Sequence, residues 1–549
     1  MRVHFAGLQG GRTYRCTHPS ETMGVEDEHG MAMLDLVVIG AGPHALSLLT
    51  RLVDDDPDLL TEEQRVATAN PPFPNARPRL AVRNHLKKRF VASARLPGVA
   101  VVDAHGRFCA QWEHDFAGLG IPHTRSHVDL HACPFDFQSL RIWAEMHKRD
   151  NEIWHMHYID RAAALAEGYK GPFALPGTQL INDFHQSLVE RYGLEPLIRC
   201  AMVEDIDIVP PGDGECPDNP CTFALRLSDG KQLRARRVVC AMGPGPLFRG
   251  MRATLPWWAE NLSTSLSATN DPSLASRMQH SSQLMSWLLG GASDEEGKGC
   301  GASCLQGRRV LVVGGGQTAG HLSLLASRRG AAVTLAARRA LSIKSYDVEL
   351  SLVGHCRGQN LTKFWGLSME DRIKFIQKAR GGGSMSPEVY QSLLADSSVT
   401  LIEDVEVENA EWTGQDILVN FDDRDIDTSP YDFVWLATGG ALDMSLVPIF
   451  ASLQAQRPIR VSAGLPHLQP DLTWDEKCPL HVMGAFAQLQ LGPDALNLAG
   501  ARSGGVIIAK ACLQVKQRGG DIVTDTQRRH PSGRGLTSRA RRPPSSACC

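Results

Sequence analysis

The sequence predicts an α/β fold with two Rossmann-like dinucleotide-binding domains, and three observations lead to this prediction. Two short apolar segments, residues 34–39 and 309–313, are typical of parallel strands buried on both faces. Each segment runs directly into a glycine-rich turn. Each turn is followed by residues with the apolar spacing of a helix. A strand, a glycine turn and a helix in this order form the unit that holds a dinucleotide.

The composition excludes several classes of protein. The 549 residues include 57 Lys plus Arg and 60 Asp plus Glu, and the formal net charge of -3 argues against a nucleic-acid partner. The apolar runs are far shorter than the ~20 residues that span a bilayer, so no transmembrane segment is expected. Fourteen cysteines without a C-x-x-C pair indicate a reducing compartment, and we expect a cytoplasmic protein.

The first unit contains a G-x-G-x-x-A motif between its strand and its helix. Gly40 permits the tight turn, Gly42 lets the backbone approach a pyrophosphate, and Ala45 allows the helix to pack on the strand. The motif also requires an acid at the end of the second strand, where it binds ribose hydroxyls. Asp103 ends the nearest suitable strand, and its spacing fits if residues 62–96 are an insertion. The alternative is that Asp103 is an ordinary surface carboxylate.

The second unit repeats the motif with Gly314, Gly316 and Ala319. Its second strand is followed by Arg338 and Arg339, where an NAD site has an acid. Guanidinium groups suit a ribose 2'-phosphate, so this pair favours NADPH over NADH. The alternative is a solvated arginine pair at a strand end.

Two further segments have the form of a buried strand that ends in a glycine turn. They are residues 236–245 and residues 432–440, and the turn of the second contains Thr438 and Gly439. Two nucleotide units in one chain predict that the first holds FAD and the second holds NADPH.

These assignments divide the chain into five parts. We expect a disordered extension or weak targeting segment (1–30), the first part of an FAD-binding domain (31–304, with an insertion at 62–96 and a linker at 290–305), an NAD(P)H-binding domain (305–440), the C-terminal part of the FAD-binding domain (441–514) and a disordered basic tail (515–549).

Several motifs give the chain a resemblance to a known family. They are the Gly40–Ala45 turn, Trp112 in Gln-Trp-Glu-His, Leu175–Thr178, the Gly314–Ala319 turn, Ala437-Thr438-Gly439, His481–Gly484 and Leu491–Ala499. Over residues 33–512 the chain resembles two-dinucleotide-binding-domain FAD/NAD(P)-dependent oxidoreductases. The resemblance is to the flavin-dependent N-hydroxylating monooxygenases of the ornithine and lysine type, and to their uncharacterised relatives.

The resemblance implies a reaction and some site residues. In the resembling enzymes NADPH reduces FAD, dioxygen adds to give a C4a-hydroperoxyflavin, and oxygen passes to a small nucleophilic substrate. The late segments, with Gly484 and Asn497, are then expected near the flavin ring. Trp112 is either near the flavin or part of the core. His280-Ser281 resembles a His-Ser element of related monooxygenases, but the Phe and Gly that should precede it are missing.

Other readings remain open. A disulfide reductase needs a cysteine pair beside the flavin, and the nearest pairs in sequence are Cys216/Cys221 and Cys300/Cys304. A non-catalytic regulatory flavoprotein of the same fold is the other alternative. The sequence identifies no catalytic side chain and no oligomeric state, and it leaves an amine, a sulfide or a small ketone as substrates.

A metal hydrolase has little support. Three histidines recur every four residues, but prolines bracket the run and no H-E-x-x-H pattern appears. We therefore expect no metal site, and we expect these histidines to be solvated or satisfied in the core. They are His123, His127 and His131.

Overall fold

The structure is a computed structural model that describes residues 25–26, 32–67, 76–210, 220–243, 251–268, 274, 276–284, 305–354, 357–423, 425–426 and 430–518. It confirms the α/β class, because both glycine turns follow strands of parallel sheets. Among the described helices, none has both the length and the apolar character that a bilayer crossing requires.

The first large sheet has six strands in the order β23-β24-β11-β3-β4-β7. The strands are β3 (Leu36–Ile39), β4 (Val99–Asp103), β7 (Ile198–Cys200), β11 (Val238–Cys240), β23 (Thr473–Asp475) and β24 (Cys478–Val482). All pairs are parallel except the edge pair β23–β24. The residues of β3 and β11 are fully buried, as their continuous apolar composition predicts.

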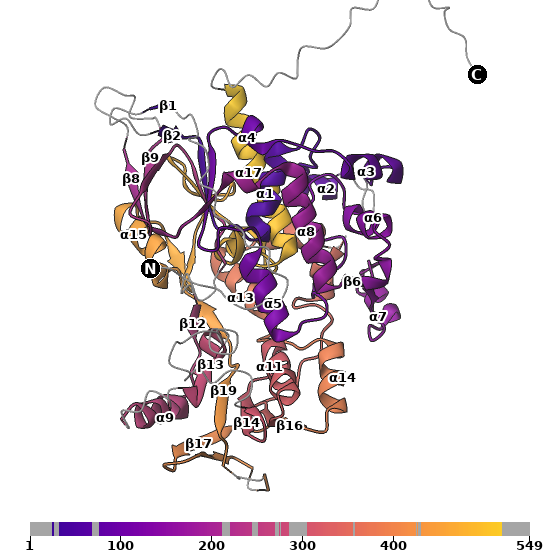
Figure 1. Cartoon of the computed structure of the whole chain (residues 1–549), viewed down its shortest axis with the longest axis vertical. Helices are drawn as coiled ribbons and strands as arrows, with labels where there is room; N and C mark the ends of the chain where they lie inside the picture. Colours follow the sequence, from indigo (N-terminus) through magenta and orange to yellow (C-terminus); the bar gives the residue numbers. More distant parts are fainter. Residues whose placement is uncertain are drawn as a thin grey trace, which may run out of the picture.

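Three helices lie side by side against this sheet in Figure 1: α1 (Pro43–Val53), α8 (Thr178–Tyr192) and α17 (Leu498–Arg518). The helices α1 and α17 approach closely because α17 has a glycine at the crossing. A Cβ on Gly505 would lie 3.0 Å from the Ser47 hydroxyl oxygen. Helix α17 also extends beyond residue 515, the expected start of the tail, and residues 519–549 lie outside the described residues.

A five-stranded sheet in the order β1-β2-β10-β9-β8 flanks the first large sheet. Its strands are β1 (Val25–Glu26), β2 (Ala32–Leu34), β8 (Val203–Val209), β9 (Thr222–Leu227) and β10 (Gln232–Ala235). Because β1 pairs with β2, the expectation that residues 1–30 lack structure is wrong for Val25–Glu26. The rest of that segment lies outside the described residues.

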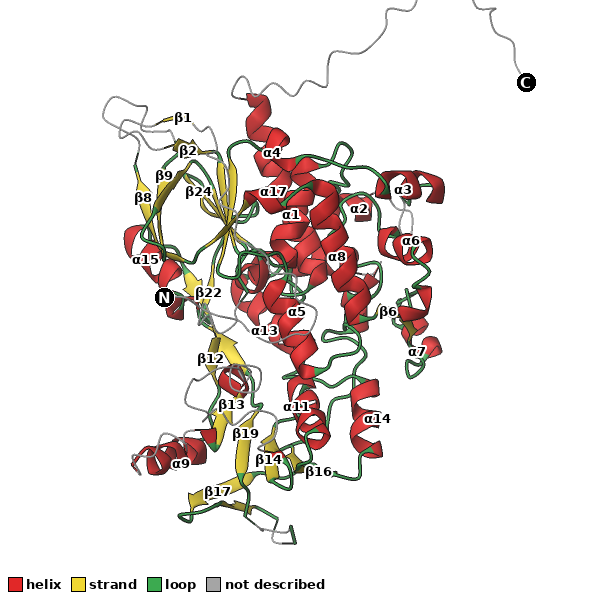
Figure 2. Cartoon of the chain, viewed as in Figure 1, coloured by secondary structure: helices red, strands yellow, loops and turns green. Residues whose placement is uncertain are grey.

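The second large sheet is wholly parallel, in the order β13-β19-β14-β15-β16, and it occupies the lower part of Figure 2. Its strands are β13 (Met278–His280), β14 (Arg309–Val313), β15 (Ala332–Ala336), β16 (Val399–Ile402) and β19 (Phe433–Leu436). Around it lie α9 (Trp257–Ala268), α11 (Gln317–Arg328), α14 (Pro387–Ala395) and the hairpin β17 (Val407–Trp412) with β18 (Ile417–Phe421).

The boundaries of the second unit differ from the expected residues 305–440. Strand β13 joins its sheet before residue 305, whereas α12 (Arg357–Trp365) and α13 (Met369–Arg380) contribute Leu361 and Ile376 to the core of the first unit. A two-stranded ribbon of β12 (Met251–Ala253) and β20 (Gly440–Leu442) connects the two units. The expected linker at 290–305 lies outside the described residues, except for residue 305.

Residues 62–96 are not a separable insertion. They form α2 (Glu62–Ala67), α3 (Arg79–Leu86) and α4 (Ala92–Arg95), with residues 68–75 outside the described part. Val82, Leu86, Phe90, Ala92 and Leu96 are buried in the main core. The expectation that residues 62–96 are an insertion is therefore corrected, because their side chains form part of the main core.

The other described α-helices and strands also belong to or border the first unit, and some of them contribute to its core. They are α5 (Ala110–Leu119), α6 (Ser139–Met146), β5 (Ile153–His155), α7 (Arg161–Ala166), β6 (Ala174–Pro176), α15 (Pro448–Gln456), β21 (Val461–Ser462), β22 (Leu465–Pro466) and α16 (Gln488–Leu491).

Candidate functional site

The first glycine loop lies at the carboxyl edge of the first large sheet, between β3 and α1. Gly40 has φ +94, and a Cβ there would lie 2.9 Å from the Ala241 carbonyl oxygen, so only glycine fits. Ala45 is completely buried where α1 packs on the sheet. The loop therefore has the conformation that the motif predicts. Two of its three small residues, Gly40 and Ala45, are required by the packing of the protein itself.

The second glycine of this loop is different, because its free side faces open space. A Cβ on Gly42 would meet no atom within 4 Å, and the same holds for Gly243 after β11. Nothing in the protein's own packing requires glycine at residue 42. Open space beside a glycine and a helix N-terminus is what a pyrophosphate needs for close approach to the backbone.

Asp103 ends β4, the strand next to β3, as the motif requires. Its carboxylate accepts a hydrogen bond from the Ala41 N–H at 3.0 Å and another from the His105 N–H at 2.8 Å. The first of these bonds ties the acid to the glycine loop. The sequence therefore predicted the location of Asp103, and contact with a ribose remains a prediction.

The late segments meet the glycine loop from the other side. Gly484 follows β24 with φ +75, and a Cβ there would lie 3.7 Å from Cε1 of His44. The His44 ring donates from Nε2 to the Leu496 carbonyl at 3.3 Å, and the Asn497 side chain caps α17 by accepting from the Ala499 N–H at 3.0 Å. Gly484 and Asn497 are thus brought to the first glycine loop.

His44 is a feature of this loop that sequence reasoning missed. Burial lowers the pKa of His44 to about 4, so the ring is neutral at pH 7. Its Nδ1 atom is buried and has no hydrogen-bond partner among the described residues. With Nε2 donating, this nitrogen is an acceptor without a donor. The motif itself contained a sign of this role, because its residue 44 places a polar imidazole in the first turn of α1.

Trp112 lies on α5, and the residue before this helix contacts the glycine loop. Cys109, at the start of that helix, donates its N–H to the Ala41 carbonyl at 2.8 Å. The Trp112 ring contacts Phe116 edge-on at 4.8 Å and lies 5.5 Å from the His185 ring. Trp112 is only partly buried and packs on the edge of the core. Contact with a flavin stays a prediction.

The second glycine loop repeats the same division of roles. Gly314 has φ +147, and a Cβ there would lie 2.3 Å from the Ala437 carbonyl oxygen. Gly316 is open, because its nearest neighbour would be the Cα atom of Gly383 at 4.0 Å, and Ala319 is buried under the sheet. The facing loop, residues 381–383, has three glycines with positive φ and was not singled out in the sequence.

Arg338 and Arg339 follow β15 at the same sheet edge as this loop. Both side chains are exposed, and no ion pair or hydrogen bond engages either guanidinium within the described part of the chain. Gly315 of the glycine loop contacts the same turn, since a Cβ there would lie 3.1 Å from Leu341. The pair is therefore available at the predicted edge, and a phosphate contact remains a prediction.

Thr438 and Gly439 follow β19 in the second sheet and lie where the connecting ribbon begins. The Thr438 hydroxyl donates to the Thr254 carbonyl at 2.5 Å, and the Gly439 carbonyl accepts from the Thr254 N–H at 3.1 Å. His280, from the suspected His-Ser element, donates from Nε2 to the same Gly439 carbonyl at 3.0 Å. These three residues therefore connect the two units, and a cofactor contact stays a prediction.

The junction between the two units contains charged residues that the sequence did not reveal. The Arg125 side chain donates to the backbone carbonyls of Lys344 and Tyr346, both at 2.7 Å. Asp347, which follows Tyr346, accepts from the Asn497 amide at 3.4 Å and pairs with Arg380 at 3.4 Å. Arg125 thus binds the backbone of the second unit, and Asp347 contacts the residue immediately before α17.

The histidine run lies in the core, but its rings are not fully satisfied there, because Nδ1 of His127 and Nδ1 of His131 have no hydrogen-bond partner among the described residues. His123, His127 and His131 are buried, and the segment that carries them is not helical. Burial lowers the pKa of His127 to about 3 and lowers the pKa of His131 well below its ordinary value. No cluster of potential metal ligands occurs among the residues that the structure describes.

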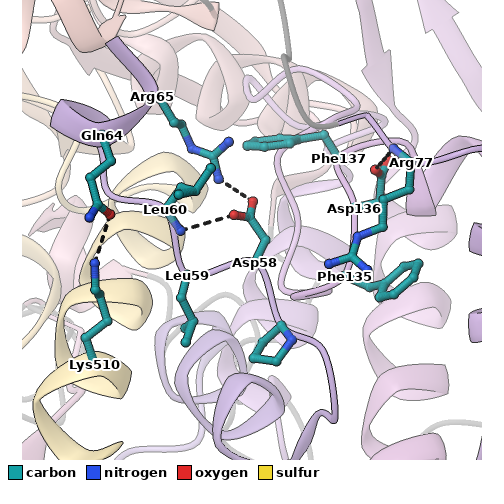
Figure 3. Close-up of a pocket in the computed structure, with 11 residues that line it drawn as sticks. Asp58, Leu59, Leu60, Gln64, Arg65, Arg77, Phe135, Asp136, Phe137 and Lys510 are labelled. Carbon is teal, nitrogen blue, oxygen red and sulfur yellow. Dashed lines mark hydrogen bonds and ion pairs between the residues drawn. The ribbon is translucent and has the colours of Figure 1, made fainter. Parts of the chain in front are cut away.

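A cavity of about 370 Å³ lies away from both glycine loops, and Figure 3 shows it. Asp58, Arg65, Phe137 and Lys510 are among its lining residues, with Arg65 paired to Asp58. Lys510 is 12 residues beyond the start of α17, so at ~1.5 Å per residue the cavity is about 18 Å along the helix from the glycine loop. It is therefore separate from the candidate nucleotide site.

Fold and site together define the class: two Rossmann-like units, each with a glycine loop at the carboxyl edge of a parallel sheet. This is the fold of the two-domain FAD/NAD(P) flavoproteins. No protein-family model and no curated protein matches the sequence.

Solved structures with this fold include three monooxygenases. The ornithine N-hydroxylase of Kutzneria sp. 744, solved with reduced FAD, NADP+ and L-ornithine, has a TM-score of 0.56 and 14% identity, covering 88% of this chain and 100% of that one. The L-lysine 6-monooxygenase of Pseudomonas syringae has a TM-score of 0.53 and 18% identity, covering 88% and 100%. The FAD-bound cadaverine monooxygenase of Erwinia amylovora has a TM-score of 0.51 and 14% identity, covering 92% and 100%. At these identities the similarity establishes the fold.

Proposed function

We propose that the protein is an FAD- and NADPH-dependent monooxygenase that uses dioxygen to oxidise a small nucleophilic substrate. The observation that carries the proposal is the open second glycine in each loop. Gly42 and Gly316 lie at helix N-termini and have room beside them that the fold does not need. Solved structures with the same fold contain FAD or NADP+, and this supports the interpretation of the two loops as nucleotide-binding loops.

The described residues fit both nucleotides. FAD would be held by the loop of Gly40, Gly42 and Ala45, with Asp103 toward the ribose and with Gly484 and Asn497 toward the ring. NADPH would be held by the loop of Gly314, Gly316 and Ala319, with Arg338 and Arg339 toward the 2'-phosphate. When bound, the flavin supplies the redox and oxygen chemistry.

The chain's own residues would then orient the cofactor and the substrate and exclude water. The Nδ1 atom of His44 is a buried acceptor that would bind a donor group of the cofactor. Arg125 donates to the backbone of the second unit and so holds it against the first. We expect this junction to help exclude water when both nucleotides are bound. Asp347 and Arg380 lie beside Asn497 and are the charged groups best placed to orient a substrate amine or carboxylate.

The reductase alternative receives little support from the described cysteines. Cys221 and Cys478 lie together, but Cys478 begins β24 and Gly484 lies beyond the other end of the strand. Six residues at ~3.3 Å each put about 20 Å between that thiol and the flavin side of the sheet. The other cysteines of the expected pairs lie outside the described residues.

The test is a spectrum followed by a reaction. Protein purified with FAD should show a bound flavin band that NADPH bleaches without oxygen and that air restores. NADPH oxidation is then measured with candidate amines, sulfides and ketones, together with the oxygenated product. Bound flavin that NADPH does not reduce would favour the non-catalytic alternative, and protein that binds no flavin would contradict the proposal.

A further inference from the structure

Two thiols from distant parts of the sequence lie side by side in the first unit. Cys221 immediately precedes β9, and Cys478 begins β24. The Cys221 N–H donates to the Lys477 carbonyl at 3.4 Å, and the Cys221 thiol donates to the same oxygen at 3.5 Å. Because Lys477 is bonded to Cys478, these contacts bring the two cysteines next to each other. The two thiols lie close enough for each to shift the pKa of the other, and neither is in a disulfide.

The surroundings make the two thiols unequal. The neighbouring Cys478 thiol lowers the pKa of Cys221, burial opposes this, and Arg457 adds to the lowering. The Cys221 thiol and burial raise the pKa of Cys478. Arg457 is held in place by a paired Asp475 in the strand next to β24. Cys221 is therefore the better nucleophile, and Cys478 is a protonated neighbour.

We propose that Cys221 and Cys478 form a redox pair that a peroxide converts reversibly into a disulfide. In the first step the Cys221 thiol loses its proton, the thiolate attacks one peroxide oxygen, and the O–O bond breaks. The leaving hydroxide takes up the proton that Cys221 lost, so the products are a sulfenic acid on Cys221 and water. In the second step Cys478 attacks the Cys221 sulfur, the S–S bond forms, the S–O bond breaks, and the hydroxide leaves as water with the Cys478 proton. The two sulfurs supply two electrons, and one hydrogen peroxide becomes two waters.

The disulfide would fasten the five-stranded sheet to the first large sheet. Strand β9 belongs to the former and β24 to the latter, and the two cysteines are far apart in the sequence. A covalent link between distant residues restricts the unfolded chain, so the oxidised form should be more stable than the reduced form. This inference does not depend on the proposed function, because the peroxide is supplied from outside.

The test maps thiols in the full-length protein after graded hydrogen peroxide. Remaining thiols are alkylated under denaturing conditions, and the digested peptides are identified by mass. The exposed Cys200 reports that the oxidant acts, and the buried Cys240, whose pKa burial raises to about 12, is the matched unpaired thiol. We expect a Cys221–Cys478 cross-linked peptide that a dithiol reductant reverses, and a melting temperature raised by about 5 °C or more.

Two variants separate the steps. In Cys478→Ala the sulfenic acid on Cys221 should persist and be trapped by a dimedone reagent, whereas in Cys221→Ser the thiol of Cys478 should stay reduced. A Cys240→Ser variant should still form the cross-link. The proposal is overturned if both cysteines remain reduced in the wild-type protein at peroxide levels that oxidise Cys200. A cross-link from Cys221 to Cys216 instead would also overturn it.

Discussion

At the scale of the residue, the two glycines of the first loop have different reasons to be glycine. Gly40 is required by the protein's own backbone, whereas Gly42 has free space on the side where a side chain would stand. The same contrast recurs between Gly314 and Gly316 in the second loop. Stability and nucleotide binding can therefore be separated by single substitutions within one motif.

Replacing Gly42 with valine should leave the fold intact and abolish FAD binding, because the side chain fills the space beside the helix N-terminus. Flavin content and thermal unfolding of the same preparation measure the two effects. The matched control is Gly40→Ala, which should lower the free energy of unfolding by about 2 kcal/mol or more, because alanine is strained at its φ of +94. Full flavin occupancy in Gly42→Val would contradict the assignment of the loop.

Arg338 and Arg339 should set the preference between the two nicotinamide nucleotides. A charge-assisted contact with the 2'-phosphate would make NADPH bind about ten- to a hundredfold more tightly than NADH. Replacing both arginines with alanine should weaken NADPH selectively and leave NADH nearly unchanged. Titration of both nucleotides against both proteins gives the comparison. Equal affinities of the native protein for NADPH and NADH would show that Arg338 and Arg339 are solvated residues at the end of a strand.

At the scale of the element, buried ion pairs connect helices that are distant in the sequence. Arg357 on α12 binds Asp494 with bonds of 2.6 and 2.9 Å and also binds Glu62 on α2 at 2.8 Å. Arg357 and Asp494 are both buried. Burial opposes the charge of Arg357, but the two carboxylates raise its pKa overall. The network joins α2, α12 and the loop before α17.

Replacing Arg357 with methionine should lower the free energy of unfolding by about 3–5 kcal/mol, because it leaves the Asp494 carboxylate buried without its partner. Chemical denaturation measures the loss. Combining the change with Asp494→Asn removes the unpaired charge and should recover at least half of the lost stability. An equal loss in the single and double variants would show that packing by Arg357, rather than its charge, is what matters.

Residues 62–96 should prove essential to folding. Four large buried apolar side chains at ~1.5–3 kcal/mol each, with Ala92 beside them, amount to about 10 kcal/mol, which is comparable to the whole stability of a domain. Replacement of the segment by a short glycine-serine linker should therefore abolish cooperative unfolding. Circular dichroism during a thermal scan is a sufficient measurement.

Two leucines of α3 provide a matched control for this prediction. Leu86 is buried and Leu80 is 69% exposed. Changing Leu86 to alanine should cost about 2–5 kcal/mol, whereas the same change at Leu80 should stay within about 0.5 kcal/mol. Similarly small losses of stability at both leucines would contradict the prediction and would support the interpretation of residues 62–96 as a tolerated insertion.

At the scale of the whole molecule, buried neutral histidines couple folding to pH. Burial lowers the pKa of His127 and of His185 to about 3, and it lowers the pKa of His131 well below the ordinary value. In the unfolded chain these rings take up a proton near pH 6.5. Stability is therefore complete above pH 6.5 and is lost as pH falls from 6.5 toward the folded pKa values. Asp129 opposes this trend, because burial raises its pKa to about 6.

Taken alone, His127, His131 and His185 against Asp129 give a net uptake of about two protons on unfolding between pH 6 and pH 4, which contributes a fall of about 2–3 kcal/mol per pH unit to the free energy of unfolding. Burial also lowers the pKa of His44, His321 and His481 to about 4, so the whole protein should show a steeper fall than this contribution. Urea unfolding at several pH values measures the slope. His185→Gln keeps an acceptor for the Ala132 N–H and should reduce the slope by about 1.4 kcal/mol per pH unit. An unchanged slope in that variant would show that His185 is not among the groups responsible.

The sequence by itself determined the two strand–glycine–helix units, the strand that ends in Asp103 and the arginine pair after the second unit. These features are local: a buried strand, a turn that needs glycine and a helix each leave a pattern within a few residues. The tertiary structure alone decided that residues 62–96 join the core, that Met278–His280 completes the second sheet and that Cys221 lies beside Cys478. Each of these depends on contact between residues far apart in the chain, and no periodicity or spacing records which distant segment a strand or a side chain will meet.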